Sequence, residues 1–124
     1  MESFSFSLFM REGGWGMWPV ALLGVVTLAA AARYMARPER SSLPFVAAMW
    51  VTLLVTVAHA TLTDVAAVLA HAQDPARAPD DQLVRILMIG LKESTRPAAF
   101  GGIFLTLVPL FVAVGTYRAW SAQR

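Results

Sequence analysis

Two polar clusters interrupt apolar segments of this chain, and their side chains could carry protons or lock helices together. The first is Thr52, Thr56, His59, Thr61, Thr63 and Asp64, and the second is Lys92, Glu93, Ser94, Thr95 and Arg96. Ionisable groups at membrane depth are costly, so they usually pair with one another or face a protein interior or a wet cavity. These two clusters therefore contain the candidate functional residues.

Ion pairs across a helical hairpin are one way to satisfy these charges. If the two segments fold back on each other about the middle of their connecting loop, Asp64 lies level with Gly90, within a turn of Lys92. We therefore expect Asp64 to pair with Lys92 or Arg96. Glu93 is expected to pair with Arg96 at the i,i+3 spacing.

Each polar residue also has a purely structural interpretation. A threonine in a membrane helix commonly donates its hydroxyl to its own backbone, and His59 can be a hydrogen-bonded interior residue. The charges from Lys92 to Arg96 can instead lie at the membrane interface, because residues 97–116 alone are long enough to span the hydrocarbon. The sequence leaves these alternatives open.

The elements that position the clusters are transmembrane helices. The chain has 124 residues, of which 57% are hydrophobic and 15% charged, with a mean hydropathy of +0.59. A first helix is predicted over residues 15–36, because Trp15 and Trp18 suit one membrane interface and Arg33 and Arg37 the other. A cleaved signal peptide is the alternative, but the apolar run is long and its positive charge follows it.

Two further helices complete an all-α, three-helix membrane domain over residues 1–124. They are predicted over residues 44–72 and 82–117, separated by loop-forming prolines and aspartates. The third helix is longer than a bilayer requires, and kinks are expected at Pro97 and Pro109. Arginines in the first connection and the tail predict a cytoplasmic C-terminus and a periplasmic N-terminus in a bacterial inner membrane.

Several function classes are disfavoured. A formal charge of +2 is too small to indicate nucleic-acid binding, and the absence of cysteine excludes thiolate metal sites. The sequence contains no HExxH, GxSxG or Walker motif, and His59 and His71 lack metal-ligand spacing. We therefore expect neither an enzyme nor a metal or other cofactor.

Three patches of sequence resemble the MotA/TolQ/ExbB proton-channel family. Residues 9–40 are similar to the family's first helix, with a Gly-Gly pair, an aromatic-proline start and a closing Glu-Arg. Residues 52–57 (TLLVTV) resemble its LLGTV signature. The third-helix pattern GIxEALxxTAxGL…IPA is matched by residues 90–93 (GLKE), 98–102 (AAFGG) and 108–110 (VPL).

The resemblance implies a homo-oligomeric ring, usually a pentamer, around a single-helix partner of the MotB/TolR/ExbD type. Thr56 matches the pore threonine of the family and Glu93 its third-helix glutamate. His59, one helical turn from Thr56, is the candidate relay. Ala98 stands where the family has a threonine. The family's large cytoplasmic domain between the first two helices is replaced by a short connection.

An ion-driven envelope subunit is thus the leading expectation, and a non-conducting structural scaffold is the alternative. A dimeric transporter is less favoured, because no inverted repeat is visible.

Overall fold

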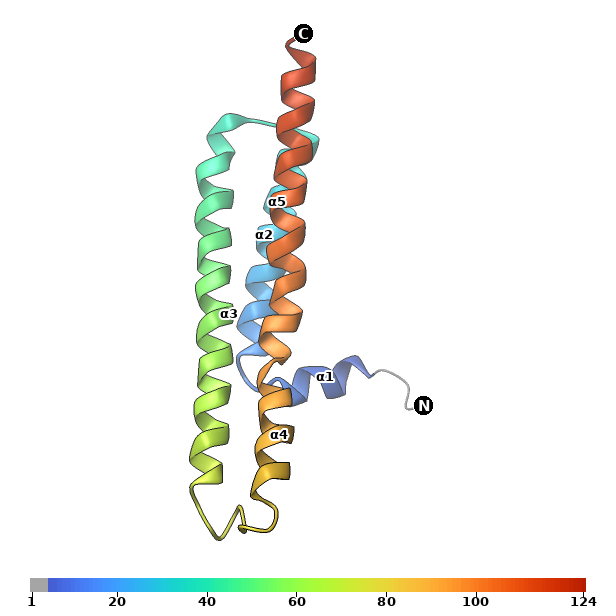
Figure 1. Ribbon diagram of the computed structural model, residues 1–124. Coiled ribbons are helices and arrows are strands. Elements are labelled where there is room, and N and C mark those ends of the chain that lie inside the picture. The colour runs from blue at the N-terminus through green and yellow to red at the C-terminus, as the bar shows by residue number, and fades with distance from the viewer. Residues whose placement is uncertain (1–4) are drawn as a thin grey trace.

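Helices account for most of the chain in the computed structural model, which describes residues 5–124 (Figure 1). Their bounds are α1 Phe6–Glu12, α2 Met17–Ala36, the 3₁₀ helix η1 Arg40–Ser42, α3 Leu43–Ala72, α4 Leu83–Ser94 and α5 Arg96–Ala122. The described residues include no strand, so the predicted all-α fold is confirmed. Three stretches, Met17–Ala36, Arg40–Ala72 and Leu83–Ala122, are long and apolar enough to cross a membrane. The chain is a multi-pass membrane protein.

The first spanning helix, α2, is close to the thickness of a bilayer core. Its 20 residues correspond to about 30 Å at 1.5 Å per residue. The helix ends because Pro38 disfavours a helical conformation at the residue before it, and Arg37 is accordingly extended, with φ −133° and ψ 88°. The predicted span of residues 15–36 therefore differs from α2 by two residues at its start.

The second spanning helix, α3, is longer than that core. Pro44 lies in its first turn, where the missing amide hydrogen costs nothing. Its 30 residues correspond to about 45 Å. The helix gives way at Gln73 to a turn in which Asp74 accepts a hydrogen bond from the Ala76 amide at 3.0 Å. Residues 44–72 were the expected span, and the observed helix agrees with it.

The third predicted helix, residues 82–117, is two helices with a break at Thr95. Pro97 has no amide hydrogen to donate to the Glu93 carbonyl, and the ladder of α-helical hydrogen bonds is interrupted here. Thr95 closes α4 instead, donating its amide to Lys92 O at 3.3 Å and its hydroxyl to the same carbonyl at 2.7 Å. Pro109, the other expected kink, lies inside the continuous helix α5.

Small residues let α2, α3 and α5 approach one another closely. A side chain at Gly24 of α2 would overlap the Phe104 ring of α5, and one at Gly101 of α5 would overlap Val57 of α3. Two core clusters fill the bundle, one around Val20, Leu53, Val57 and Ala60 and one around Ala31, Val46 and Val108. Van der Waals packing of this kind, rather than the hydrophobic effect, is what holds helices together in lipid.

A short helix absent from the sequence-based prediction, α1, projects sideways from the bundle beside the α4–α5 break (Figure 1). Its start is capped by the Ser5 hydroxyl, which accepts from the Leu8 amide at 3.4 Å. Phe6 and Phe9 pack edge-on against Phe100 of α5, with ring centroids 6.3 and 6.0 Å away. These contacts fix the start of the described chain against the third spanning helix.

The two ends of the molecule differ in what they contain. The α3–α4 loop extends past α1 at one end, whereas η1 and the C-terminus lie at the other (Figure 1). We call α2, residues 43–63 of α3 and residues 97–122 of α5 the bundle. We call α1 and residues 64–96, which comprise the end of α3, the α3–α4 loop, α4 and Arg96, the hairpin end.

Candidate functional site

A polar stripe runs along one face of α3. Thr52, Thr56, His59 and Thr63 recur at spacings of four, three and four residues, which places them on one side of a helix. Thr52, His59 and Thr63 are exposed and Thr56 is partly buried. The stripe therefore faces away from the core of this single chain.

The threonine hydroxyls of the stripe donate to their own helix. Thr52 donates to Ala48 O at 2.8 Å, Thr56 to Thr52 O at 2.7 Å and Thr63 to His59 O at 2.8 Å. The hydroxyl protons of these threonines are thus used in backbone hydrogen bonds of their own helix, as the structural interpretation predicts. Each hydroxyl oxygen still keeps lone pairs that can accept a hydrogen bond from water or from another subunit.

A hollow of about 330 Å³ beside the start of α2 is lined by most of the stripe residues. Its lining includes Trp15, Gly16 and Pro19 from the α2 side and Thr56, His59, Thr63 and Asp64 from α3. The two helices meet closely here, because a Cβ atom at Gly16 would lie only 2.6 Å from that of Ala60. The structure therefore brings together Thr56, His59 and Asp64, three of the six predicted site residues.

Asp64 lies at the junction between this hollow and a second one. The α1–α2 turn passes over its carboxylate: a Cβ atom at Gly14, whose φ is +74°, would lie 3.2 Å from Asp64 Oδ1. Oδ2 is buried and has no hydrogen-bond partner. The second hollow, of about 170 Å³, is lined by Asp64 together with Glu12, Gly90, Glu93 and Ser94. Glu93 thus lies beside Asp64 and separately from Thr56.

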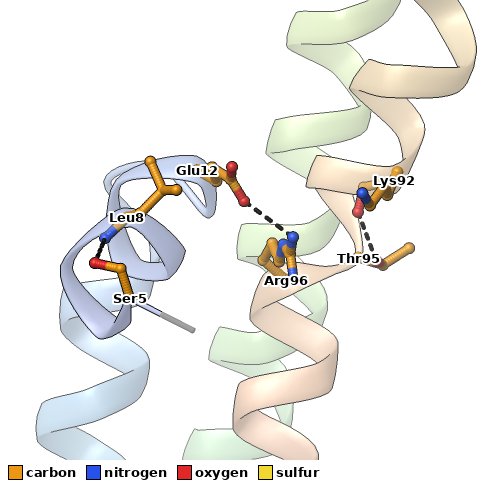
Figure 2. Close-up of polar contacts among 6 residues, drawn as sticks. All are labelled: Ser5, Leu8, Glu12, Lys92, Thr95 and Arg96. Atoms are coloured by element: carbon orange, nitrogen blue, oxygen red, sulfur yellow. Dashed lines mark hydrogen bonds and ion pairs between the residues drawn. The ribbon is translucent and has the colours of Figure 1, made fainter. Parts of the chain in front are cut away.

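Arg96 pairs with Glu12 of α1 rather than with a residue of the predicted clusters (Figure 2). Its Nη2 atom lies 2.9 Å from Glu12 Oε2, and the guanidinium also lies 5.0 Å from the centre of the Phe9 ring. Its Nε atom is buried without a hydrogen-bond partner. Sequence reasoning missed Glu12 because only the two long helices were considered as sources of partners.

The predicted ion pairs of Asp64 and Glu93 are therefore corrected. The two ion pairs among residues 5–124 are Glu12–Arg96 and the exposed pair Asp74–Arg77. Gly90 packs against Val68, one helical turn from the Asp64 level that we expected. Lys92 lies exposed on α4, whereas Glu93 and Ser94 line the hollow with Asp64. The Thr95 hydroxyl donates to the backbone carbonyl of Lys92 (Figure 2).

The length of α2 indicates how deep the ionisable groups of the site lie in the membrane. Glu12, Gly14 and Asp64 lie together at the start of α2, so they mark one boundary of the roughly 30 Å that α2 can span. Arg96 lies at the same level through its pair with Glu12, at an interface where charge costs less than at the bilayer centre. His59 and Thr56 lie about 7 and 12 Å deeper along α3.

Among the described residues, no three His, Asp or Glu side chains form a group that could hold a metal ion. Compared with family models, with curated proteins and with solved structures, the chain matches none. The polar stripe and the two hollows are thus the features of the chain that indicate a function.

Proposed function

We propose that the chain is an oligomeric inner-membrane subunit in which the α3 stripe faces a shared interior, as in the MotA/TolQ/ExbB proteins that its sequence resembles. The observation that carries this proposal is the stripe itself: Thr52, His59 and Thr63 are exposed on a helix within the membrane-spanning bundle. Polar side chains at that depth face protein or water rather than lipid. A ring of copies supplies both.

The exposed face of α2 supports the same arrangement. Trp18, Leu22 and Val25 are 63%, 67% and 59% exposed, and all three suit contact with lipid. A ring with α2 outside and the α3 stripe inside covers the polar surface and leaves an apolar one exposed. We expect about five copies, by the family resemblance.

Ion transfer would use His59, Asp64 and Glu93, with the Thr56 oxygen ordering water. Asp64 lines both hollows, so it connects the deeper pair, Thr56 and His59, with Glu93 at the hairpin end. Neither residues 43–63 of α3 nor α5 contributes a carboxylate. A continuous proton path through the bilayer therefore needs an acid from elsewhere, such as the aspartate of a single-helix partner of the MotB/TolR/ExbD type.

The orientation of the chain in the membrane is inferred from the positions of its arginines. Arg33, Arg37 and Arg40 lie together around the short α2–α3 connection, with Glu39 as the only acid there. Short loops rich in arginine favour the cytoplasm. The hairpin end, which contains Glu12, Asp74, Asp80, Asp81 and Glu93, would then face the periplasm.

Proteoliposomes containing a pH-sensitive dye test the conducting role. The isolated protein is expected to show little flux, and coexpression with a cognate single-helix partner is expected to produce flux that His59→Ala and Asp64→Asn reduce. Lys92→Gln, at an exposed residue outside both hollows, is the matched control and should conduct normally.

A non-conducting scaffold is the second candidate. It is favoured by the hydrogen bonds that the threonine hydroxyls of the stripe donate. All three threonines of the stripe donate to backbone carbonyls, so the stripe can serve helix packing alone. An assembled ring with a bound partner but no flux would support the scaffold.

A further inference from the structure

A groove at the end opposite the candidate site combines a basic mouth with an apolar floor. It lies between the last turns of α2 and the start of α3 and has a volume of about 510 Å³. Its floor includes Val26, Ala29, Phe45 and Val46, and its mouth includes Arg33 and Arg37. Arg33 is in the last turn of α2 and Arg37 is the C-cap of that helix, so both arginines lie at the same end of α2.

The charges of this mouth are not neutralised within the chain. Both ion pairs among residues 5–124 lie at the hairpin end, and neither uses Arg33 or Arg37. Glu39 lines the groove but forms no ion pair with either arginine. Ser41 adds an exposed hydroxyl, while the Ser42 hydroxyl donates to Glu39 O at 2.7 Å. The mouth therefore presents two guanidinium groups with no carboxylate bound to them.

We infer that this groove binds an anionic phospholipid from the leaflet at this end of the molecule. The phosphate would lie between Arg33 and Arg37, because guanidinium groups form strong paired hydrogen bonds with phosphate oxygens. One acyl chain would lie along Val26, Ala29 and Phe45, which continue the groove toward the bilayer centre. A basic pocket between transmembrane helices with apolar walls below it has the polarity profile of a lipid, charged at the headgroup and apolar beneath.

Depth supports this occupant over a soluble anion. Arg33 lies in the last turn of α2 and Arg37 at its C-cap, where a helix matched to the hydrocarbon core reaches the phosphate level of the bilayer. Val26 lies about two turns deeper, within the acyl region. A free phosphate ion would use the mouth and leave the apolar floor uncovered.

Native mass spectrometry of the full chain released from nanodiscs tests the inference. The discs contain equal amounts of phosphatidylglycerol and phosphatidylcholine, and the readout is the phosphatidylglycerol retained per chain. R33Q/R37Q is expected to lower retention about tenfold or more, because each arginine near the surface contributes to the attraction. R40Q/R124Q removes the same charge at the same end but outside the groove, and it should retain lipid as the wild type does.

A third variant tests the apolar floor without changing charge. Ala29→Trp fills the groove and is expected to lower retention as well, with the α-helical circular dichroism of all variants unchanged. Equal losses in the two double variants would show diffuse attraction and overturn the inference. So would full retention in Ala29→Trp, or displacement of the lipid by inorganic phosphate alone. A wild type that retains no lipid, with an oligomeric state that changes in R33Q/R37Q, would assign the groove to a second copy.

Discussion

The bundle and the hairpin end are built by different physical means. In the bundle, buried polar groups are few and have partners: Thr27 donates to Leu23 O at 2.6 Å, and the hydroxyls of Tyr34 and Thr116 lie 3.0 Å apart. At the hairpin end, ionisable groups meet at the start of α2, and Asp64 Oδ2 and Arg96 Nε are buried without hydrogen-bond partners. Such orphaned atoms are rare in native structures and call for an explanation.

The difference indicates where stability and function reside. Close packing in the bundle sets the spacing of α2, α3 and α5, and its polar face is the outward α3 stripe. The hairpin end holds charges at the membrane boundary, next to the hollow that reaches down to His59 and Thr56. A substitution in the bundle should therefore change stability most, and one at the exposed surface of the hairpin end should change it least.

The largest effect is expected at Gly101, where a methyl group would overlap Val57 and lie 3.2 Å from Val20. Overpacking of a tight core typically costs about 1–3 kcal/mol. Gly101→Ala should lower the thermal unfolding midpoint in mild detergent, followed by tryptophan fluorescence. Gly102→Ala is the matched control, since nothing lies within 4 Å of its added methyl group. Equal destabilisation of the two variants would show that the helices do not meet at Gly101.

The next effect is expected at the Glu12–Arg96 pair. The two side chains are 30% and 27% exposed, so the pair lies between a surface and a buried ion pair, and Glu12→Gln should cost about 1–2 kcal/mol. Because Glu12 ends α1, the same variant should speed hydrogen exchange in residues 6–12. Arg77→Gln removes one partner of the exposed Asp74–Arg77 pair and should change stability by less than about 0.5 kcal/mol. Unchanged exchange in α1 would mean that the aromatic contacts hold it without the ion pair.

The smallest effect is expected at Lys92. This residue is exposed and forms no ion pair among residues 5–124, so Lys92→Met should change the free energy of unfolding by less than about 0.5 kcal/mol. The sequence-based pairing with Asp64 predicted a loss of several kcal/mol instead. A large loss in chemical or thermal unfolding would restore that pairing.

Length and apolar patterning were sufficient to predict the three spanning segments. The bounds of α3 are nearly those expected, because Pro44 and the Asp74-Pro75 turn are local signals at its two ends. A kink was expected at Pro97, which lacks the amide that a regular helix needs, and the structure has instead a break between α4 and α5 at Thr95. Pro109, by contrast, lies within the continuous helix α5. Its missing amide would leave the Leu105 carbonyl without a donor, and the Trp50 indole Nε1–H donates to that carbonyl at 3.0 Å.

The contacts between elements were much less predictable. The register of α3 on α4 differs by one turn from the symmetric hairpin, and the rotation of α4 places Glu93 and Ser94, rather than the exposed Lys92, beside Asp64. The partner of Arg96 came from α1, a seven-residue helix too short to give a clear periodic signal. Charge pairing depends on register and rotation to within one residue, whereas the sequence pattern defines only which segments are apolar.

The most direct test of the central claim, that the α3 stripe faces a shared interior, is cross-linking of single cysteines in native membranes. The chain has no cysteine of its own, so Thr56→Cys and Leu22→Cys place one thiol each on the stripe and on the exposed face of α2. A short bismaleimide should join copies carrying Thr56→Cys into a ladder of oligomers and leave copies carrying Leu22→Cys as monomers. Cross-linking at Leu22 alone, or at neither residue, would contradict a ring with its polar stripe inside.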